Sequence, residues 1–371
     1  MRNRALDAIR GMAILLVILH HLAMPFRLPL RDGILAEVLH PRLIGILSHN
    51  GYLAVYVFFV LSGFLITQRA LERHGELSRI NWRVFYHQRF ARIAPLLLVL
   101  LVVLSILHGL GVPGYTIQKD GQSLFRAQLA ALLLHLNWYE GKVGWLPASW
   151  DVLWSLSIEE AFYLMFPVAC LLFNKRWLTL LLLALLCSLP ITRAWYDGNP
   201  IWQEKAYLPA FSAISGGVLC ALLAQSWQYS RSFAHALTTC GALAFALQLW
   251  LPGELWRLLG HASILYIVLA AMLLMLGLHR SDWRSAPAWL TLMGKLSYEL
   301  YLTHMFVVLS IVALWKSLQL DQYYSALIYP LAVFLCVRLA MAVERGITRP
   351  AALWLRPAHS LASRTQDVCR R

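Results

Sequence analysis

The sequence predicts an all-α membrane protein, a polytopic bundle of about ten transmembrane helices. Of its 371 residues, 60% are hydrophobic and only 13% are charged, and the mean hydropathy is +0.61. A soluble domain carries about 25% charged residues, so the composition excludes an ordinary soluble protein. No Gly/Ser-rich linker divides the chain. We therefore expect one membrane domain over residues 1–350, followed by a basic cytoplasmic tail over residues 351–371.

Hydropathy assigns the candidate spans one by one, using the ~20 apolar residues that a helix needs to cross a bilayer. They fall at residues 6–26, 46–67, 93–110, 150–173, 177–195, 206–226, 234–251, 258–278, 288–315 and 323–344. An eleventh segment, residues 124–137, has an apolar core of only about ten residues, which suits a re-entrant or interfacial helix. It is therefore left out of the spans.

The distribution of positive charge predicts the orientation of the bundle. The net charge is +14, and 22 of the 32 basic residues fall on one side if the N-terminus is cytoplasmic. Ten spans then place both termini inside, since short cytoplasmic loops carry the excess of Lys and Arg. This topology signal, and not nucleic-acid binding, explains the basic composition. Arg27, Arg31 and Arg42, in the first outer loop, go against the rule and stay unexplained.

The first span, "LDAIRGMAILLVILHH", holds ionisable groups in a segment bound for lipid. Such groups cost at least ~2–3 kcal/mol at bilayer depth, so they usually have a function. Arg10 and His21 are eleven residues apart, three helical turns plus about 20°, and so lie on one face roughly 16 Å apart. His20 is rotated about 80° away. A structural alternative, an interhelical hydrogen bond from His21 and a snorkelling Arg10, stays open.

A second motif, "RVFYHQRFARIAP", places Arg89 and Arg92 one turn apart at the start of the third span. The planar guanidinium group suits phosphate, so this pair is a candidate site for a phosphorylated cofactor at the cytoplasmic face. Topology signalling and attraction to anionic lipids are the alternatives.

Acidic residues occur in the candidate span at 150–173, within "SWDVLWSLSIEEAFYLMFPV". Asp151, Glu159 and Glu160 must be paired, protonated or exposed to a wet cavity. Glu159 follows Ser155 by one turn, so the hydroxyl can satisfy the carboxylate. A carboxylate near a histidine could orient it, as in assemblies of a nucleophile and a base. A purely structural bond between helices is the alternative.

A further motif, "GKLSYELYLTHMF", spaces Tyr298, Tyr301 and His304 by three residues. An aromatic belt at the membrane interface explains the two tyrosines, but it does not explain the histidine.

Taken together and in order, these motifs and "FFVLSGFLIT" at 58–67 resemble those of the acyltransferase 3 family of integral membrane acyltransferases. The resemblance covers essentially the whole chain. It implies O-acyl transfer, usually of acetyl from cytoplasmic acetyl-CoA, to a hydroxyl of a surface glycan such as O-antigen or exopolysaccharide. It also implies a place in the bacterial inner membrane, and partners that include the acyl-CoA donor, a glycan or lipid-linked glycan acceptor and membrane lipids.

The resemblance also implies roles for individual residues. The catalytic set is Arg10, His21 and Glu159, with His21 either a general base or the carrier of the acyl group. The donor-binding pair is Arg89 and Arg92, and the substrate-binding or structural motif positions are Ser62, Gly63, Tyr298 and His304. No metal is expected, and the oligomeric state stays open. One departure concerns the last span, where the family often has Glu, one residue, then Pro, whereas Glu344 and Pro350 are six apart here. The tail is therefore assigned no role.

Two other functions fit a chain with many spans and buried charges. Internal repeats, or broken helices in matching halves of the chain, would indicate a transporter or flippase, and neither feature is evident in the sequence. A glycan polymerase has large outer loops, and here only residues 25–45 and 138–149 are long enough to count.

Overall fold

The computed structural model describes residues 3–280 and 286–355, and within these ranges the chain is helical without strands. Nine helical segments of the described part are long and apolar enough to cross a membrane. They are Arg4–Ala23, Gly51–His74, Trp82–Gly109, Ala148–Leu172, Pro200–Ser226, Arg231–Trp250, Ala262–His279, Ser297–Ser317 and Gln322–Trp354. The protein is thus a multi-pass membrane protein, as its composition predicts.

The α-helices are α1 (Arg4–Ala23), α2 (Ile34–Val38), α3 (Pro41–His49), α4 (Gly51–His74), α5 (Trp82–Gly109), α6 (Leu124–Leu132), α7 (Leu136–Val143), α8 (Ala148–Asp151), α9 (Leu153–Leu172), α10 (Lys175–Cys187), α11 (Leu189–Ala194), α12 (Pro200–Lys205), α13 (Tyr207–Ser226), α14 (Arg231–Trp250), α15 (Pro252–Leu259), α16 (Ala262–His279), α17 (Ala288–Lys295), α18 (Ser297–Ser317), α19 (Tyr329–Val343) and α20 (Arg349–Trp354). Two 3-10 helices, η1 (Leu77–Arg79) and η2 (Gln322–Ile328), and one π-helical turn, η3 (Glu344–Thr348), complete the described elements.

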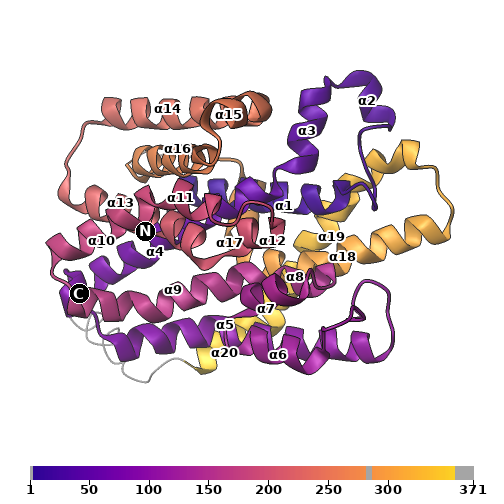
Figure 1. Ribbon diagram of the computed structural model, residues 1–371, viewed down its shortest axis with the longest axis horizontal. Coiled ribbons are helices and arrows are strands. Elements are labelled where there is room, and N and C mark those ends of the chain that lie inside the picture. Colours follow the sequence, from indigo (N-terminus) through magenta and orange to yellow (C-terminus); the bar gives the residue numbers. More distant parts are fainter. Residues whose placement is uncertain (1–2, 281–285, 356–371) are drawn as a thin grey trace, which may run out of the picture.

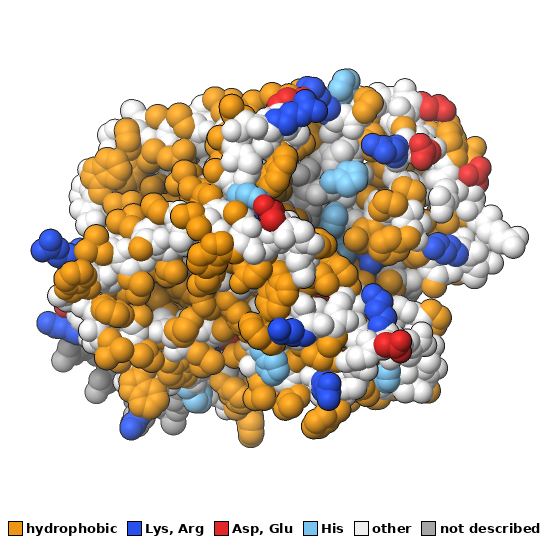
Figure 2. Space-filling model, viewed as in Figure 1, with side chains coloured by type: hydrophobic (Ala, Val, Ile, Leu, Met, Phe, Trp, Pro, Cys, Tyr) orange, Lys and Arg blue, Asp and Glu red, His pale blue; other side chains and the backbone are white. Residues whose placement is uncertain are grey.

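The long helices run alongside one another, with the α14–α16 pair along one edge and α5, α6 and α9 along the opposite edge (Figure 1). Helix α1 lies between them and packs against α4, α17 and α18, while α13 packs against α4 and α10. Hydrophobic side chains cover much of the outer face shown in Figure 2. This exposed apolar surface is what a helix bundle needs in order to sit in lipid.

Two segments differ from uniform spans, each for a local reason. The expected span at 177–195 is divided into α10 and α11, because Pro190 stands at the start of α11 and cannot continue the helix before it. With only 13 residues, α10 is not among the nine candidate spans, one fewer than the ten expected. The segment at 124–137 breaks between α6 and α7, where Leu134 has a φ of 61°. It forms no crossing helix, in agreement with its short apolar core.

A further candidate span from the hydropathy assignment also differs in its boundaries. The expected span at 288–315 is two helices, α17 and α18, which meet at Leu296. The orientation with both termini inside stays a prediction. Most of the predicted basic tail, residues 356–371, lies outside the described residues.

Asparagine caps set the start of two helices that carry site residues. The Asn3 side chain accepts hydrogen bonds from the Ala5 and Leu6 backbone N–H groups, which begins α1. The Asn81 side chain accepts from the Val84 N–H and begins α5. Such caps satisfy N–H groups that have no partner within the helix. They place Arg10 in the second turn of α1 and Arg89 near the start of α5. We call the end of the bundle where these two arginines lie the arginine end.

Glycines bring α4 and α13 into close contact. A Cβ atom added at Gly217 would lie 1.9 Å from the Val60 carbonyl oxygen, and one at Gly63 would lie 2.0 Å from the Ile214 carbonyl oxygen. Each helix thus presents a glycine to the backbone of the other. Small residues at such positions are the usual way for membrane helices to approach closely. Gly63 therefore has a packing role in the structure.

We expect Gly217→Ala to destabilise the protein by about 1–3 kcal/mol, because the added methyl group must push two backbones apart. Thermal unfolding in one detergent measures the effect. Gly45→Ala is the matched control, since a Cβ atom there meets nothing within 4 Å. Equal unfolding temperatures for the two variants would contradict the close packing of α4 on α13.

Candidate active site

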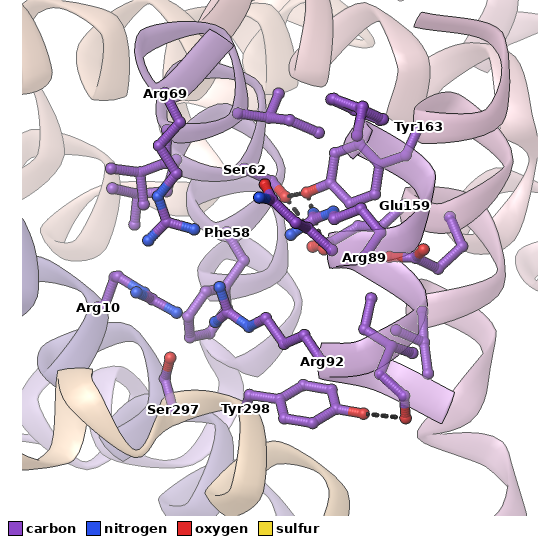
Figure 3. A pocket seen from close by; sticks show the side chains of 18 of the residues that line it. Arg10, Phe58, Ser62, Arg69, Arg89, Arg92, Glu159, Tyr163, Ser297 and Tyr298 are labelled. Carbon is purple, nitrogen blue, oxygen red and sulfur yellow. Dashed lines mark hydrogen bonds between the residues drawn. The ribbon is translucent and has the colours of Figure 1, made fainter. Parts of the chain in front are cut away.

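A cavity of about 470 Å³ opens among α1, α4, α5, α9 and α18 at the arginine end. The arginines of its lining are Arg10, Arg69, Arg73, Arg89 and Arg92. Figure 3 shows Arg10 and Arg69 extending into the space from one side and Arg92 from the other. Several guanidinium groups that converge in a half-enclosed space form a binding site for phosphate or carboxylate groups.

One wall of the cavity is a polar network between α4, α5 and α9. Ser62 Oγ donates to Glu159 Oε2 at 3.0 Å and is also hydrogen-bonded to the Tyr163 hydroxyl. The Tyr163 hydroxyl reaches the same carboxylate oxygen at 3.4 Å. The Arg89 guanidinium group stacks over the Tyr163 ring, 3.7 Å from its centre (Figure 3). Glu159 is therefore held by two hydroxyls and compensated by a nearby arginine.

The deep end of the cavity is formed by Ser155 of α9 and Tyr301 of α18. Ser155 Oγ donates to the Tyr301 hydroxyl at 2.7 Å, and the Tyr301 ring packs edge-on against Phe58. Tyr298, one turn before Tyr301, also lines the cavity and donates its hydroxyl to the Ile93 carbonyl oxygen at 2.9 Å. The lining stops at these residues and includes neither His21 nor His304.

Behind Tyr301 lies a pair of histidines from α1 and α18. His304 is fully buried, and its Nδ1 lies 2.8 Å from the Tyr301 carbonyl oxygen and 3.1 Å from that of Leu300. Its Nε2 lies 3.3 Å from His21 Nδ1, which is 2.8 Å from the Val17 carbonyl oxygen. The two imidazole rings are 5.0 Å apart.

These contacts decide which nitrogens carry protons in the neutral pair. A carbonyl oxygen only accepts, so Nδ1 of His304 and Nδ1 of His21 are both the protonated nitrogens. His304 Nε2 then accepts from His21 Nδ1–H, which it shares with the Val17 carbonyl. The lone pair of His21 is left on Nε2. The arrangement therefore makes Nε2 of His21 the basic, nucleophilic atom. The His20 ring packs edge-on against His21, with ring centres 5.4 Å apart, but its Nδ1 is 2.8 Å from the Ser48 carbonyl oxygen, so His20 is outside the hydrogen-bonded pair.

Arg27 lies beside the histidine pair, on the side away from the cavity. This residue follows α1, is only 3% exposed, and donates from Nη1 to the His21 carbonyl oxygen. Burial lowers the pKa of Arg27 to about 10, while the Asp151 carboxylate acts in the opposite direction. A buried cation thus lies next to His21. This contact gives a structural place to one of the arginines of the predicted outer loop.

A buried ionic cluster joins the segments on the same side of the bundle as Arg27. The Lys205 ammonium group is fully buried, 2.7 Å from Glu140 Oε2 and in contact with Asp151 Oδ1. It also lies 4.0 Å from the centre of the Trp145 ring. Burial raises the pKa of the Glu140 carboxyl group, and Lys205 opposes this shift. The cluster ties α7, α8 and α12 together.

No group of three or more His, Cys, Asp or Glu residues within the described ranges is arranged to hold a metal ion. The geometry is that of two connected parts, an arginine-lined cavity and a histidine pair behind it. The model of the acyltransferase 3 family, described as an acyltransferase domain, matches residues 3–345. The chain belongs to the acyltransferase 3 family. The match to an acyltransferase domain favours acyl transfer over the transporter and polymerase alternatives.

Curated proteins similar to this chain are named as O-acetyltransferases. The peptidoglycan O-acetyltransferase OatA of Listeria monocytogenes is 26% identical over 335 residues, 81% of this chain and 48% of the relative. Two proteins named provisionally are also similar, an O-acetyltransferase of Staphylococcus aureus (25% over 375 residues, 93% and 56%) and a peptidoglycan O-acetyltransferase of Bacillus subtilis (27% over 326 residues, 81% and 47%). The chain spans about half the length of these relatives. No solved structure matches it.

The structure gathers most of the sequence-predicted residues but divides them between the cavity and the histidine pair. Arg10, Arg89, Arg92, Glu159, Ser62 and Tyr298 line the cavity, and Gly63 faces α13 instead. His21 and His304 form the pair behind Tyr301. Arg10 and His21 share a helix face but not a cavity. The roles of all these residues stay predictions.

Sequence reasoning missed several members of the two parts. Tyr163 follows Glu159 by four residues and Arg69 follows Ser62 by seven, so helical spacing could have found both. Lys205 was detectable as a lone lysine at the start of an apolar span. Glu140 carried no signal, because its position relative to Lys205 depends on the tertiary fold.

Proposed function

We propose that this protein transfers an acyl group, most often acetyl, from acyl-CoA to a hydroxyl group of a glycan of the bacterial cell envelope. The cavity receives the donor, and the histidine pair performs the transfer. The observation that carries the proposal is a continuous path of contacts: Tyr301 lines the arginine-lined cavity, its ring packs against His304, and His304 is hydrogen-bonded to His21. The membrane in question is the inner membrane, the one that separates cytoplasmic acyl-CoA from envelope glycans.

The arginines suit the donor because CoA is rich in phosphate. Arg10, Arg89 and Arg92 face a common space, and phosphate groups bind guanidinium groups through charge-assisted hydrogen bonds. The phosphates are then held at the arginine end, which the charge distribution predicts to be cytoplasmic. The thioester end of the donor points deeper, toward Ser155 and Tyr301. Arg89 is kept beside this path by Tyr163, on which it stacks and whose hydroxyl contacts Ser62 and Glu159.

The histidine pair suits the transfer step. Nε2 of His21 takes the proton of the acceptor hydroxyl as its oxygen forms a bond to the thioester carbonyl carbon. The carbon–sulfur bond then breaks, and the proton passes from His21 to the leaving CoA thiolate, so that an ester and free CoA result. His304 holds the ring of His21 in position. Arg27, a cation beside the pair, stabilises the negative charge that develops on the carbonyl oxygen.

The acceptor class rests on the names of the relatives, which are peptidoglycan O-acetyltransferases and O-acetyltransferases. An O-antigen or an exopolysaccharide presents the same kind of hydroxyl. Mass spectrometry of envelope glycans from the host, with and without this protein, tests the proposal. We expect ester-linked acyl groups that disappear with the protein and return with it. Identical acylation in both strains would overturn the proposed function.

We expect Arg92→Gln to weaken binding of acyl-CoA by about tenfold to a hundredfold, since hydrogen bonds to charged groups contribute ~1.5–3 kcal/mol. Titration of the purified protein with an unreactive CoA thioether measures the change. Arg83→Gln is the matched control, because Arg83 lies on the same helix, is exposed and does not line the cavity. Unchanged affinity in the Arg92 variant would count against the donor role of the cavity.

We expect Arg89→Gln to weaken donor binding and also to lower stability. Arg89 stacks on Tyr163 and lies near Glu159 and Glu160, so its loss removes the charge that compensates two carboxylates in an apolar setting. The same titration and thermal unfolding separate the two effects.

A further inference from the structure

A second cavity, of about 710 Å³, runs along the opposite edge of the bundle from α5. It lies between the α14–α16 pair and helices α1 and α4, and Figure 1 shows α14 as the outermost helix on this edge. Its lining on α14 extends from Arg231 to Leu249, about 27 Å at 1.5 Å per residue. The space is thus a long groove on the lipid-facing side of the protein, separate from the donor cavity.

Charge is confined to one end of this groove. Arg231 and His235 lie in the first two turns of α14, and Arg280 follows the last residue of α16. Because α14 and α16 form an antiparallel pair, these three side chains meet at one end. The remaining lining of α1, α4 and the rest of α14 is apolar apart from Thr238.

The cationic end is built from fixed elements. Arg280 donates from Nη1 to the Tyr229 carbonyl oxygen at 2.6 Å and from Nη2 to Gln228 Oε1, and its guanidinium group lies 5.0 Å from the centre of the Tyr229 ring. These contacts hold it against the start of α14 and leave its remaining N–H groups for a ligand. The 20-residue helix α14 also directs the positive end of its dipole toward the same place. Two arginines and a helix N-terminus together attract a phosphate group. Leu278 of α16 and Ile9 of α1 continue the lining from this end into the apolar part.

We propose that this groove binds one phospholipid of the surrounding bilayer, with its anionic phosphate headgroup at Arg231 and Arg280 and an acyl chain along α14. A long apolar groove with cations at one end matches the polarity of such a lipid from head to tail. A soluble metabolite does not need the apolar length, and a helix from a partner protein does not need the cationic end. The bound lipid fills the space between α14 and α1, and so joins the α14–α16 pair to the rest of the bundle.

The test uses the full chain purified in an uncharged detergent, with phosphatidylglycerol as the anionic probe and phosphatidylcholine as the zwitterionic comparison. Native mass spectrometry measures retained lipid, and thermal unfolding measures stabilisation. We expect about one phosphatidylglycerol per chain, bound at least about tenfold more tightly than phosphatidylcholine. Equal binding of the two lipids, with many copies of each, would show only a nonspecific lipid shell and would overturn the proposal.

Two variants locate the site. Arg231→Gln removes the headgroup contact, and Ala242→Trp fills the groove from an exposed position on α14. We expect each to lower the affinity for phosphatidylglycerol by at least about tenfold. The controls are Arg176→Gln and Ala184→Trp, exposed positions of the same residue types on α10. The proposal fails if all four variants bind phosphatidylglycerol as the wild type does, or if the α10 variants lose as much affinity as the α14 variants.

Discussion

A His21→Ala variant is expected to lose acyl transfer while the protein remains folded and inserted in the membrane. Removing a general base costs about 10²–10⁴-fold in rate, and removing an acyl carrier abolishes the reaction. The lone pair on Nε2, fixed by the contacts of both Nδ1 atoms, makes this side chain the reactive one in the pair. Quantification of glycan-bound acyl esters, relative to the amount of protein in the membrane fraction, measures the loss.

The neighbouring histidine provides a matched control. His20→Ala removes the same ring one residue away. This ring packs edge-on against His21, but its hydrogen bond is to the Ser48 carbonyl and not to either histidine of the pair. We expect its activity to stay near that of the wild type. Full activity in His21→Ala would refute the catalytic assignment. Incubation of the wild type with acyl-CoA, without an acceptor, then distinguishes the two chemical roles, because only a carrier yields a peptide acylated at His21.

Lys205→Met is expected to be the most destabilising of the substitutions considered, by about 3–5 kcal/mol. Lys205 is fully buried between Glu140 and Asp151, and its loss leaves their negative charge in a nonpolar setting without compensation. Thermal unfolding in detergent, together with the yield of folded protein, measures the effect. Lys175→Met, at the exposed start of α10, removes the same charge and is expected to unfold near the wild-type temperature.

A triple variant separates charge from packing. If the uncompensated carboxylates cause the loss, then adding Glu140→Gln and Asp151→Asn to Lys205→Met restores part of the stability, because neutral amides replace the charges. A triple variant that is less stable than Lys205→Met would show that the ammonium group acts mainly through its packing against Trp145.

The sequence predicts the class of fold because lipid imposes a simple requirement, that long apolar segments form helices. It predicts less about where helices break. The division of α10 from α11 depends on Pro190, whose effect is local and was readable. The division of α6 from α7 depends on a left-handed backbone conformation at Leu134. This could not be predicted from the sequence, because leucine rarely adopts that conformation. The short apolar core of that segment was nevertheless enough to keep it out of the spans.

The candidate site shows the same limit more strongly. Helical spacing correctly places Arg89 beside Arg92, because both lie on one helix and face one cavity. The pairing of His21 with His304 joins residues 283 apart, and only the packing of α1 on α18 brings them together. Arg27 shows the same limit in another way. The charge distribution marked this arginine as an exception to the topology rule, but it could not predict the hydrogen bond from Arg27 to the His21 carbonyl oxygen. Position along a helix is readable from one sequence, whereas the partner helix is not.

The closure of the arginine-lined cavity at Ser155 and Tyr301 has a consequence for ion permeability. An enzyme that uses a substrate from each side of a membrane, as we propose for this protein, risks becoming a leak for protons and other small ions. Two hydroxyl-bearing side chains, hydrogen-bonded to each other and packed against Phe58, lie between the arginine end and the histidines. An ion that passed from the cavity to the histidine pair would have to part this contact, so the closed arrangement opposes such a leak.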